Sequence, residues 1–464
     1  MTDSSFSGFL ADIWTGLGGD REALTSVTET GEGSLPSVFA VSDLAAASIG
    51  AAGLAAAELI ARRRGRPHGR RPDVRVDRRL ASFWFGVSLR PQGWALPPAW
   101  DPVAGDYAAA DGWIRLHTNA PHHRAAALGV LGVPVDKEQV ARAVARWNKA
   151  ELETAVVTRG GCAAAMHTRQ EWAAHPQGRA VAAEPLVHTD IAPEIPRPDW
   201  PVPQARPLQG IRVLDLTRVL AGPVATRFLA GLGADVLRID PPDWDEPGVV
   251  PDVMLGKRAA RLDLRTAGGR SVFERLLAGA DVLVHGYRSD ALSGLGLDHA
   301  RRRAIRPGLV DVALDAYGWT GPWRARRGFD SLVQMSSGIA DAGMRGLGKD
   351  RPHPLPVQAL DHACGYVVAA TALAGLTRRM ETGHGCTART SLARIAALLV
   401  GGSRSPDEVV LAPESADDVS EKVESTGWGP AYRIRPPVVV SGTPLQWDRP
   451  AGPLGTSSAA WLQT

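Results

Sequence analysis

The hydrophobic positions between residues 207 and 400 form short apolar runs separated by segments with helical spacing. Strand candidates are "IRVLDL" (211–216), "ADVLRID" (234–240), "DVLVHGY" (281–287) and "LVDVAL" (309–314). Between them, "VATRFLAGLG" and "GRSVFERLLAG" have the apolar spacing of helices. Strands that alternate with helices indicate βαβ units. The pattern therefore predicts an α/β fold whose large domain is a mainly parallel, doubly wound sheet.

The preceding half of the chain has a different pattern. Residues 36–64 are typical of one alanine-rich helix, and "PDVRVDRRLASFWFGVSL" begins like a strand and continues as a buried segment. A compact mixed unit follows, with a turn and strand in "GDYAAADGWIRLHT", helical spacing over 136–158, and a helix around "MHTRQEWAAH". The proline-rich stretch 188–210 predicts an extended linker.

These patterns divide the chain into five parts. The expected parts are 1–90, 91–190, a linker (191–206), 207–400 and 401–464. The family resemblance described below implies that the first is a partial large-domain segment, the second a smaller α+β second domain, the fourth the large domain and the last a closing segment.

The sequence also contains a weak internal repeat. "LPSVFAVSDLAAASIGAAGLAAAELIARRRG" (35–65) is similar to "PLPVQALDHACGYVVAATALAGLTRRMETG" (354–383). Each has an apolar approach, an aspartate, a helix of small residues and a basic end. The two aspartates, Asp43 and Asp361, are 318 positions apart. Two alanine-rich helices can look alike by chance, so the repeat alone decides nothing.

Composition indicates the class of protein. The chain has 464 residues, 44% hydrophobic and 22% charged, with a net charge of +3, which is typical of a soluble globular protein with two or three lobes. The basic run 61–79 has no interleaved aromatic residues, so we interpret it as a solvated linker and expect no nucleic-acid partner. Three cysteines without CxxC spacing fit a reducing cytoplasm.

No targeting or membrane segment is expected. The first residues, "MTDSSFSGFLADIW", lack the basic start of a signal peptide. The apolar stretch 44–57 is too short to span a bilayer, and we interpret it as a buried helix. The predicted location is therefore the cytoplasm, without membrane contact.

The glycine pattern argues against a dinucleotide site. Such a site requires GxGxxG between the first strand and its helix, with an acid at the end of the next strand. Asp240 is at that strand end, but the loop "LTRVLAGPV" has one glycine. An NAD-dependent oxidoreductase is therefore a poor interpretation. The helix start at Pro223 still offers free N–H groups to an anion.

The motif "PVQALDHACGY" (356–366) contains the strongest candidate for chemistry. Taken alone, an aspartate before an apolar helix favours an N-cap over a nucleophile. His362 and Cys364 do not form a triad with Asp361 at these spacings, so we assign them to packing or to the surface. The competing acids are Asp330 and Asp43.

Four segments in sequence order resemble the class III CoA-transferases (CaiB/BaiF type). They are "PLQGIRVLDLTRVLAGPVATRFLAGLGADVLRIDPP", "GKRAARLDLRTAGGRSVFERLLAGADVLVHGYR", "LGLDHARRRAIRPGLVDVALDAYGWTGPWRARRGFDSLVQMSSG" and "PLPVQALDHACGYVVAATALAGL". The resemblance implies a Rossmann-like large domain that binds acyl-CoA, a small second domain, and an interlocked homodimer. It also implies transfer of CoA to a carboxylic acid, with no metal.

The resemblance assigns Asp361 as the nucleophile. Its carboxylate would attack the thioester, giving an acyl-aspartyl anhydride and then an aspartyl-CoA thioester. We expect that a carboxylate at a helix start stays ionised, so that one residue serves as both cap and nucleophile.

The same resemblance implies a set of CoA contacts. "RGFD" would line the cofactor site near the thioester, although Asp330 is equally well explained as a turn residue. Lys257 and Arg258 would bind phosphates unless they are in a solvated loop, and the family's Asn-Phe is replaced by Gly286-Tyr287. The full expected set is Leu220, Ala221, Lys257, Arg258, Leu262, Asp263, Leu264, Arg265, Gly286, Tyr287, Arg288, Arg327, Gly328, Phe329 and Asp330.

Two further features affect the choice of reaction. Racemases of this family carry histidine where this chain has Phe329, which favours transfer over racemisation. The segments that resemble the small domain precede the large domain, out of family order. Residues 30–90 therefore resemble the end of a truncated copy, in which Asp43 is structural or vestigial. A catalytically silent acyl-CoA-binding subunit remains an alternative.

Overall fold

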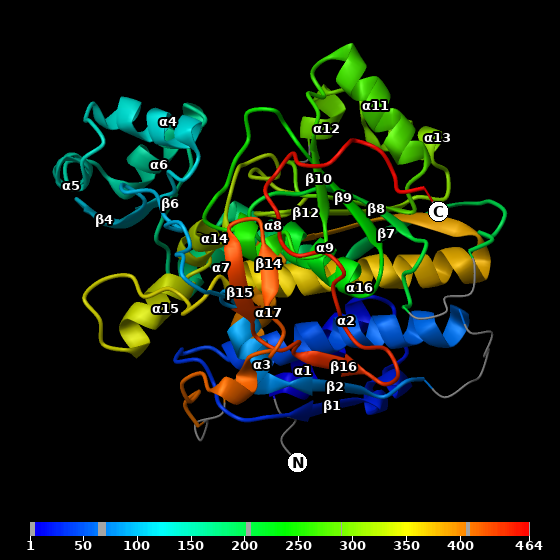
Figure 1. Ribbon diagram of the computed structural model, residues 1–464. Helices are drawn as coiled ribbons and strands as arrows, with labels where there is room; N and C mark the ends of the chain where they lie inside the picture. The colour runs from blue at the N-terminus through cyan, green and yellow to red at the C-terminus, as the bar shows by residue number, and fades with distance from the viewer. Residues whose placement is uncertain (1–4, 64–70, 201–205, 289, 405–408, 464) are drawn as a thin grey trace.

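A computed structural model describes residues 5–63, 71–200, 206–288, 290–404 and 409–463. Part of the basic run 61–79 and part of the predicted linker lie outside the described residues. A seven-stranded sheet, in the order β10-β9-β8-β11-β12-β13-β7, organises the protein (Figure 1). Its strands are β7 His188–Glu194, β8 Arg212–Leu216, β9 Asp235–Asp240, β10 Arg258–Arg261, β11 Val282–His285, β12 Val310–Asp315 and β13 His384–Ser391.

Six strands of this sheet are parallel, and β7 is antiparallel to β13. The predicted mainly parallel α/β sheet is confirmed. The chain runs outward through β8, β9 and β10, then returns to the other side of β8 with β11, β12 and β13, so the order reverses between β8 and β11. Residues 191–194 of the predicted linker belong to β7, because the sheet edge offers hydrogen bonds that the proline pattern does not reveal.

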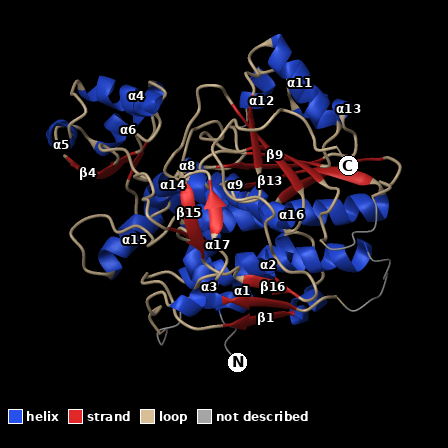
Figure 2. Cartoon of the chain, in the orientation of Figure 1, coloured by secondary structure: helices blue, strands red, loops and turns tan. Residues whose placement is uncertain are grey.

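Helices cover both faces of the sheet (Figure 2). The apolar faces of one group pack against β8, β9 and β11 in a core centred on Leu214, Leu237 and Leu283. On the other face, α9 and α16 separate the sheet from the N-terminal part of the chain. The helices of residues 206–404 are α9 Ala221–Gly231, α10 Val250–Val253, α11 Ala267–Ala278, α12 Ala291–Gly294, α13 His299–Ile305, α14 Asp330–Ser336, α15 Ile339–Gly346, α16 Ala359–Thr382 and α17 Leu392–Gly401.

The N-terminal part forms a second, smaller layer whose topology repeats part of the large sheet. Its three strands have the order β1-β2-β16, with β1 parallel to β2 and β16 antiparallel to it. The order and directions match β12-β13-β7. The elements are α1 Ser5–Gly16, η1 Arg21–Ser26, β1 Val27–Thr30, α2 Val41–Arg63, β2 Val74–Asp77, α3 Arg78–Trp84 and β16 Val438–Val440.

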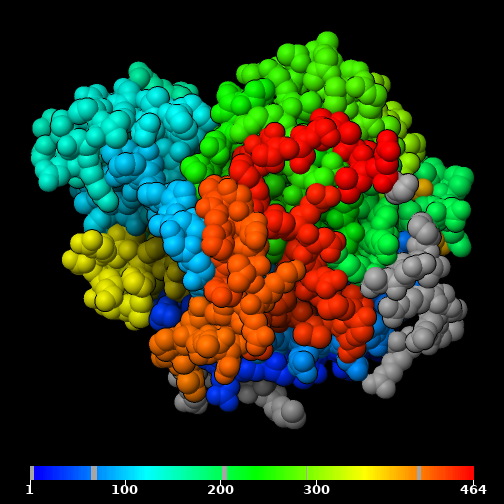
Figure 3. Space-filling view, viewed as in Figure 1, coloured from blue at the N-terminus to red at the C-terminus, as the bar shows by residue number. Residues whose placement is uncertain are grey.

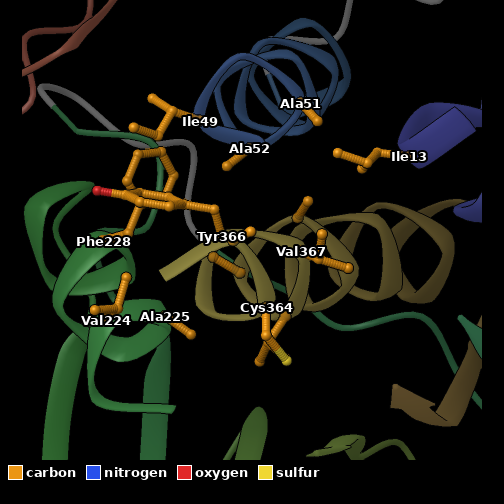
Figure 4. Close-up of a cluster of buried hydrophobic side chains, with 14 of the residues drawn as sticks. Ile13, Ile49, Ala51, Ala52, Val224, Ala225, Phe228, Cys364, Tyr366 and Val367 are labelled. Carbon is orange, nitrogen blue, oxygen red and sulfur yellow. The ribbon is translucent and has the colours of Figure 1, made fainter. Parts of the chain in front are cut away.

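The sequence repeat has a structural counterpart. In each copy a long helix leads into a strand and then a short helix, capped by Asp77 in one copy and Ser391 in the other. The long helices α2 and α16 lie side by side, and Ala52 of α2 faces Tyr366 of α16 in a buried cluster that also includes Phe228 (Figure 4). Alanine and glycine allow this close approach.

A small unit projects from one side of the molecule. Its antiparallel sheet β4-β5-β6 and three helices enclose their own core around Tyr107, Ile114 and Leu152. The region predicted as one helix over 136–158 is two helices, because the chain turns at Trp147 and restarts at Asn148. The unit comprises β4 Gly105–Ala109, β5 Gly112–Leu116, α4 Pro121–Leu131, α5 Lys137–Val144, α6 Lys149–Thr158 and β6 Ala163–Ala165.

The remaining elements connect these parts. The C-terminal segment crosses the front of the molecule (Figure 3) and pairs with residues 89–91 in a fourth sheet, β14-β15-β3. The elements are β3 Leu89–Pro91, α7 Arg169–Ala174, α8 Pro176–Ala183, η2 Ala416–Asp418, β14 Glu424–Thr426 and β15 Gly429–Arg433.

By length and composition alone, α2 and α16 could each cross a membrane. However, 94% of the apolar window of each helix is buried inside the structure. Core helices of folded proteins have the same property.

Candidate active site

Asp361 lies in the first turn of α16, but it is not the N-cap. That position belongs to Gln358, which makes no side-chain capping bond. The N–H of Asp361 donates to Oδ2 of Asp330 at 2.9 Å. The prediction that Asp361 caps its helix is therefore wrong, because the free N–H groups are satisfied by a carboxylate from the start of α14.

The two carboxyl groups lie close together and are buried. Asp330 is fully buried and Asp361 is 8% exposed. Burial, followed by the neighbouring charge of Asp330, raises the pKa of Asp361 well above its usual range. Burial also raises the pKa of Asp330, although hydrogen bonds from the N–H of Asp361 and from Gln334 oppose this. The expectation that the helix start keeps Asp361 ionised is corrected, since desolvation is the larger effect.

Asp330 faces the start of α16 rather than a ligand surface. Its carboxylate binds the side-chain amide of Gln334 as well as the N–H of Asp361. Asp330 therefore contacts the helix that carries the candidate nucleophile, and it is absent from the cleft lining. Its position does not support the prediction that it lines the cofactor site.

His362 and Cys364 are packing residues. The ring of His362 stacks on Phe85 at 5.3 Å between centroids. Burial lowers the pKa of His362 to about 3. Cys364 is fully buried in the cluster of Figure 4, and burial raises the pKa of its thiol well above the usual value. Neither group has the properties of a catalytic partner for Asp361.

A cleft of about 1070 Å³ lies between the carboxyl ends of β8–β11 and the small unit. Ligands of α/β proteins bind at this edge, where the strand order reverses. The volume is at the upper end of the range for small-molecule sites, which suits a long substrate. Residues predicted as CoA contacts that line the cleft are Leu262, Asp263, Leu264, Arg265, Tyr287, Arg288, Arg327 and Phe329.

Lys257 and Arg258 lie elsewhere, each in an internal ion pair. Lys257 is buried with its Nζ 3.2 Å from Asp215 and 2.8 Å from the carbonyl of Pro223, and burial lowers its pKa to about 8. Arg258 binds Asp235 at 2.9 Å, at the amino end of the strands. Their predicted role in phosphate binding is therefore not supported by their positions.

Four other predicted contacts are absent from the cleft lining. Leu220 and Ala221 begin α9 against α16, where a side chain at Gly365 would come within 2.4 Å of the Ala221 carbonyl. Gly286 is exposed, and a Cβ atom there would meet nothing closer than Leu314 at 3.8 Å. Gly328 packs against Tyr317 with no space for a side chain.

Several cleft residues in and around the first loop were not predicted from the sequence. The guanidinium of Arg218 lies over the rings of Trp244 (4.3 Å) and Tyr287 (5.0 Å). Among the described residues, Val219 is the only non-glycine with a positive φ, 63°. Its N–H donates to Glu246 at 2.9 Å. A β-branched residue in this conformation is strained, which is typical of functional loops. The sequence feature that could have pointed to this loop is Arg218, a basic residue two positions after the end of β8.

The small unit contributes imidazole groups to the same cleft. The ring of His117 stacks on Phe329 with centroids 3.7 Å apart, and its Nδ1 is 3.4 Å from the Ser331 hydroxyl. Burial lowers the pKa of His117 well below its usual value. Thus His117, a neutral histidine, contacts Phe329, the position at which the resemblance places a histidine in racemases. This contact depends on the tertiary fold and has no local sequence signal.

Asp43, the counterpart of Asp361 in the N-terminal copy, is neutralised. Both oxygens of its carboxylate bind Arg78 at 3.0 Å, and the pair is buried. This geometry fits the predicted structural role, since a bidentate guanidinium leaves the carboxylate no free oxygen for attack.

The described residues also bear on cofactor chemistry. Asp240, at the strand end where a dinucleotide site would hold its acid, is bound by Arg238 through two 2.9 Å hydrogen bonds. It is therefore not free to bind a ribose. Within the described ranges, no group of three or more His, Cys, Asp or Glu side chains is arranged to hold a metal ion.

Comparison with known proteins identifies the region that carries the site. Residues 208–404 match the model of CoA-transferase family III. This region, less than half of the chain, is similar to CoA-transferase family III. The family segment contains Asp361, Asp330 and the strand ends that form one wall of the cleft.

Named relatives of the family III segment are CoA-transferases. A probable fatty acyl-CoA transferase of Mycobacterium tuberculosis is 33% identical over 193 residues, which cover 39% of this chain and 48% of that protein. A succinate–glutarate CoA-transferase of Agrobacterium fabrum is 32% identical over 198 residues, covering 39% and 49%. The chain thus spans about half the length of these curated relatives.

A crystal structure of a CaiB/BaiF family protein from Brucella suis is also similar to this chain. It is 28% identical and covers 50% of this chain and 66% of that one, with a TM-score of 0.38.

Proposed function

We propose that this protein is a CoA-transferase that moves CoA from an acyl-CoA donor to a carboxylic acid. The carrying observation is Asp361, a buried carboxyl group whose side chain no described donor binds, and whose N–H is hydrogen-bonded to Asp330, the residue that follows Phe329 of the cleft lining. The named relatives support the reaction class. The reversal of strand order between β8 and β11 supports a Rossmann-like large domain.

The proposed reaction needs one nucleophile and no net proton transfer. The Asp361 carboxylate attacks the thioester carbonyl, forming an acyl-aspartyl anhydride and releasing CoA thiolate. The thiolate attacks the aspartyl carbonyl, which gives an aspartyl-CoA thioester and frees the donor acid. The acceptor carboxylate then attacks this thioester, and CoA thiolate takes the acceptor's acyl group and restores Asp361.

Burial of Asp361 suits this chemistry in two ways. It limits access of water, which would hydrolyse the anhydride and the thioester. It also makes the free carboxylate less stable than it would be in water, so that the attacking form is more reactive once ionised.

Trapping the intermediate tests the proposal. Acyl-CoA followed by hydroxylamine should convert Asp361 to a hydroxamate, which peptide mass spectrometry locates. The matched control is Asp43, which should stay unmodified. Absence of an Asp361 adduct in protein that still binds CoA would instead support a silent acyl-CoA-binding subunit. Exchange intact in Asp361→Ala would show that the nucleophile is another group.

Racemisation is tested separately. Incubation in D2O reports exchange at the α-carbon of the acyl group, and Phe329 in place of histidine leads us to expect none. Exchange at the transfer rate would favour the racemase alternative.

We also propose a cytoplasmic homodimer, as the family resemblance suggests. Because α2 already packs along α16 within one chain, we expect the second chain to dock on other surfaces. Light scattering should give about twice the 49.2 kDa of one chain. A mass of one chain would contradict the dimer.

A further inference from the structure

The loop that follows β8 is strained at Val219, whose φ is 63°. In the left-handed region a β-branched side chain crowds its own backbone, so a residue of this kind adopts the conformation only where surrounding groups hold it there. Val219 also lines the cleft. The strain therefore lies in the cleft wall, and contacts outside the loop must stabilise it.

Glu246 supplies this contact. Its Oε2 accepts the N–H of Val219 at 2.9 Å and the indole N–H of Trp244 at 3.0 Å. Its Oε1 binds Arg238, which is fully buried in β9 and is itself bound to Asp240 through two 2.9 Å hydrogen bonds. The Glu246 carboxylate is thus fixed to the large sheet on one side and holds the loop on the other.

The same carboxylate fixes an aromatic stack in the cleft. The guanidinium of Arg218 lies 4.3 Å from the ring centroid of Trp244 and 5.0 Å from that of Tyr287, and it donates to the Tyr287 hydroxyl at 3.1 Å. All three side chains line the cleft. Because Glu246 binds both Trp244 and the residue after Arg218, a change at Glu246 would alter two members of this stack together.

The other end of the loop lies against the helix that carries Asp361. Ala221 begins α9, and a Cβ atom at Gly365 would come within 2.4 Å of the Ala221 carbonyl oxygen. Gly365 is four positions after Asp361 in α16, so these two residues lie on the same face of the helix. The loop 217–221 therefore runs from the cleft wall to the face of α16 that carries the candidate nucleophile.

We propose that Glu246 is a positioning residue for acyl transfer, which holds Val219 in its left-handed conformation and so keeps the loop 217–221 in the geometry that aligns a bound thioester with Asp361. This inference rests on the proposed CoA-transferase function. Glu246 acts through the loop and touches no reacting atom. A displacement of about 1 Å from the attack geometry can lower a rate by about 100-fold. Loss of Glu246 should therefore slow acyl transfer to Asp361.

A double-mutant cycle between Glu246 and Val219 tests the proposal. Glycine adopts a positive φ without steric cost, so a loop that carries Val219→Gly does not need Glu246 to hold it. Glu246→Ala alone should slow single-turnover formation of the Asp361 adduct from saturating acyl-CoA by about 10- to 100-fold. In protein that already carries Val219→Gly, the same substitution should slow it by less than about threefold.

The competing explanation is that Glu246 matters only as the partner of Arg238. Val219→Gly does not restore that ion pair, so equal rate losses with and without Val219→Gly would overturn the proposal. An unchanged rate in Glu246→Ala would overturn it as well. Glu274→Ala removes an ion pair with Arg301 between α11 and α13, outside the cleft lining, and is the matched control that should change neither rate.

The conformation of the loop can be measured without the reaction. In a crystal structure of ligand-free Glu246→Ala, Val219 should have a negative φ, and a φ that stays near 63° would overturn the proposal. If Glu246→Ala does not fold, recovery of folded protein on adding Val219→Gly would support the same coupling, and failure to recover would contradict it.

These readouts separate the two proposals. If Val219 changes conformation in Glu246→Ala but no aspartyl adduct forms in the unmodified protein, Glu246 holds the loop and the transferase function fails. If adducts form in the unmodified protein and the effects of the two substitutions on the rate are strictly additive, transfer stands and the positioning role fails.

Discussion

Replacing Asp330 by asparagine would remove one of two neighbouring buried charges while keeping an oxygen to accept from the N–H of Asp361. The 2.9 Å bond between that N–H and Oδ2 of Asp330 keeps the two carboxyl groups within a few ångströms. At separations of about 4–6 Å and an effective dielectric constant of about 20, the repulsion between two full charges is about 3–4 kcal/mol. One pKa unit corresponds to about 1.4 kcal/mol.

Burial also raises the pKa of Asp330, and the two groups titrate as a pair, so the repulsion between two full charges is an upper limit on the shift. We therefore expect Asp330→Asn to lower the pKa of Asp361 by about 1–2 units. Asp361 attacks as the anion, so the rate rises with pH through its pKa. The acid limb of the pH–rate profile should move to lower pH by the same amount.

The assay is single-turnover formation of the aspartyl adduct from acyl-CoA, followed across pH. Asp341→Asn, a buried acid on α15 that pairs with Arg345, is the matched control and should leave the limb in place. Asp330→Ala also removes the acceptor oxygen, and we expect it to destabilise the fold by about 1–3 kcal/mol. An unchanged or raised acid limb in folded Asp330→Asn would refute the coupling between the two carboxylates.

Three further predictions concern stability. Gly365→Ala should lower the free energy of unfolding by about 1–3 kcal/mol, because the new Cβ would lie 2.4 Å from the carbonyl of Ala221 at the start of α9. Denaturant unfolding measures this loss, and an unchanged free energy would mean that α9 and α16 separate easily. Lys257→Met should leave Asp215 buried without its cation, at a cost of about 3–5 kcal/mol in the free energy of unfolding. The KM for acyl-CoA should stay unchanged in the folded fraction, and a raised KM without loss of stability would show that Lys257 binds CoA. Arg78→Met should cost a similar amount, and adding Asp43→Asn should recover part of it in a double-mutant cycle, whereas strictly additive losses would deny the pair's coupling.

The pH dependence of stability follows from the raised pKa values at the site. A carboxyl group whose folded-state pKa is raised binds its proton more tightly in the folded protein. The unfolding free energy therefore falls as pH rises from the ordinary carboxyl pKa through the raised value. Asp361→Asn should flatten this decline, as measured by denaturant unfolding at a series of pH values, and an unchanged slope would contradict the raised pKa.

Local sequence patterns predicted four strands of the large sheet, β8, β9, β11 and β12, but not the arrangement around Asp361. The strands near Val213, Val236 and Val312 are short apolar runs with clear boundaries, so their alternation with helices predicted the parallel sheet. The capping role of Asp330 could not be predicted, because it depends on two helices that meet only in the folded chain. The prediction that Asp361 stays ionised was wrong for the same reason, because the burial that raises its pKa is a property of the tertiary structure.

For the basic residues too, sequence shows where they lie along the chain but not whether they are already paired in the folded protein. Lys257 and Arg258 lie at the start of β10, which was not predicted as a strand, and sequence alone does not reveal that Asp215 and Asp235 already bind them. Arg218 and His122 come from segments nearly 100 positions apart, and the pairing of the small unit with the strand ends brings them together. A sequence pattern reports composition along the chain, while a charge is free or paired only in space.

The packing of α2 against α16 also has a consequence for synthesis. Helix α2 is buried at nearly every position, yet its partner α16 begins 318 positions later in the sequence. At about 5–20 residues per second, the ribosome would present an apolar helix without its partner for roughly 15–60 s. Nascent chains stalled before residue 359 should therefore bind holdase chaperones through residues 41–63, and a circular permutant that begins at residue 207 should shorten that exposure.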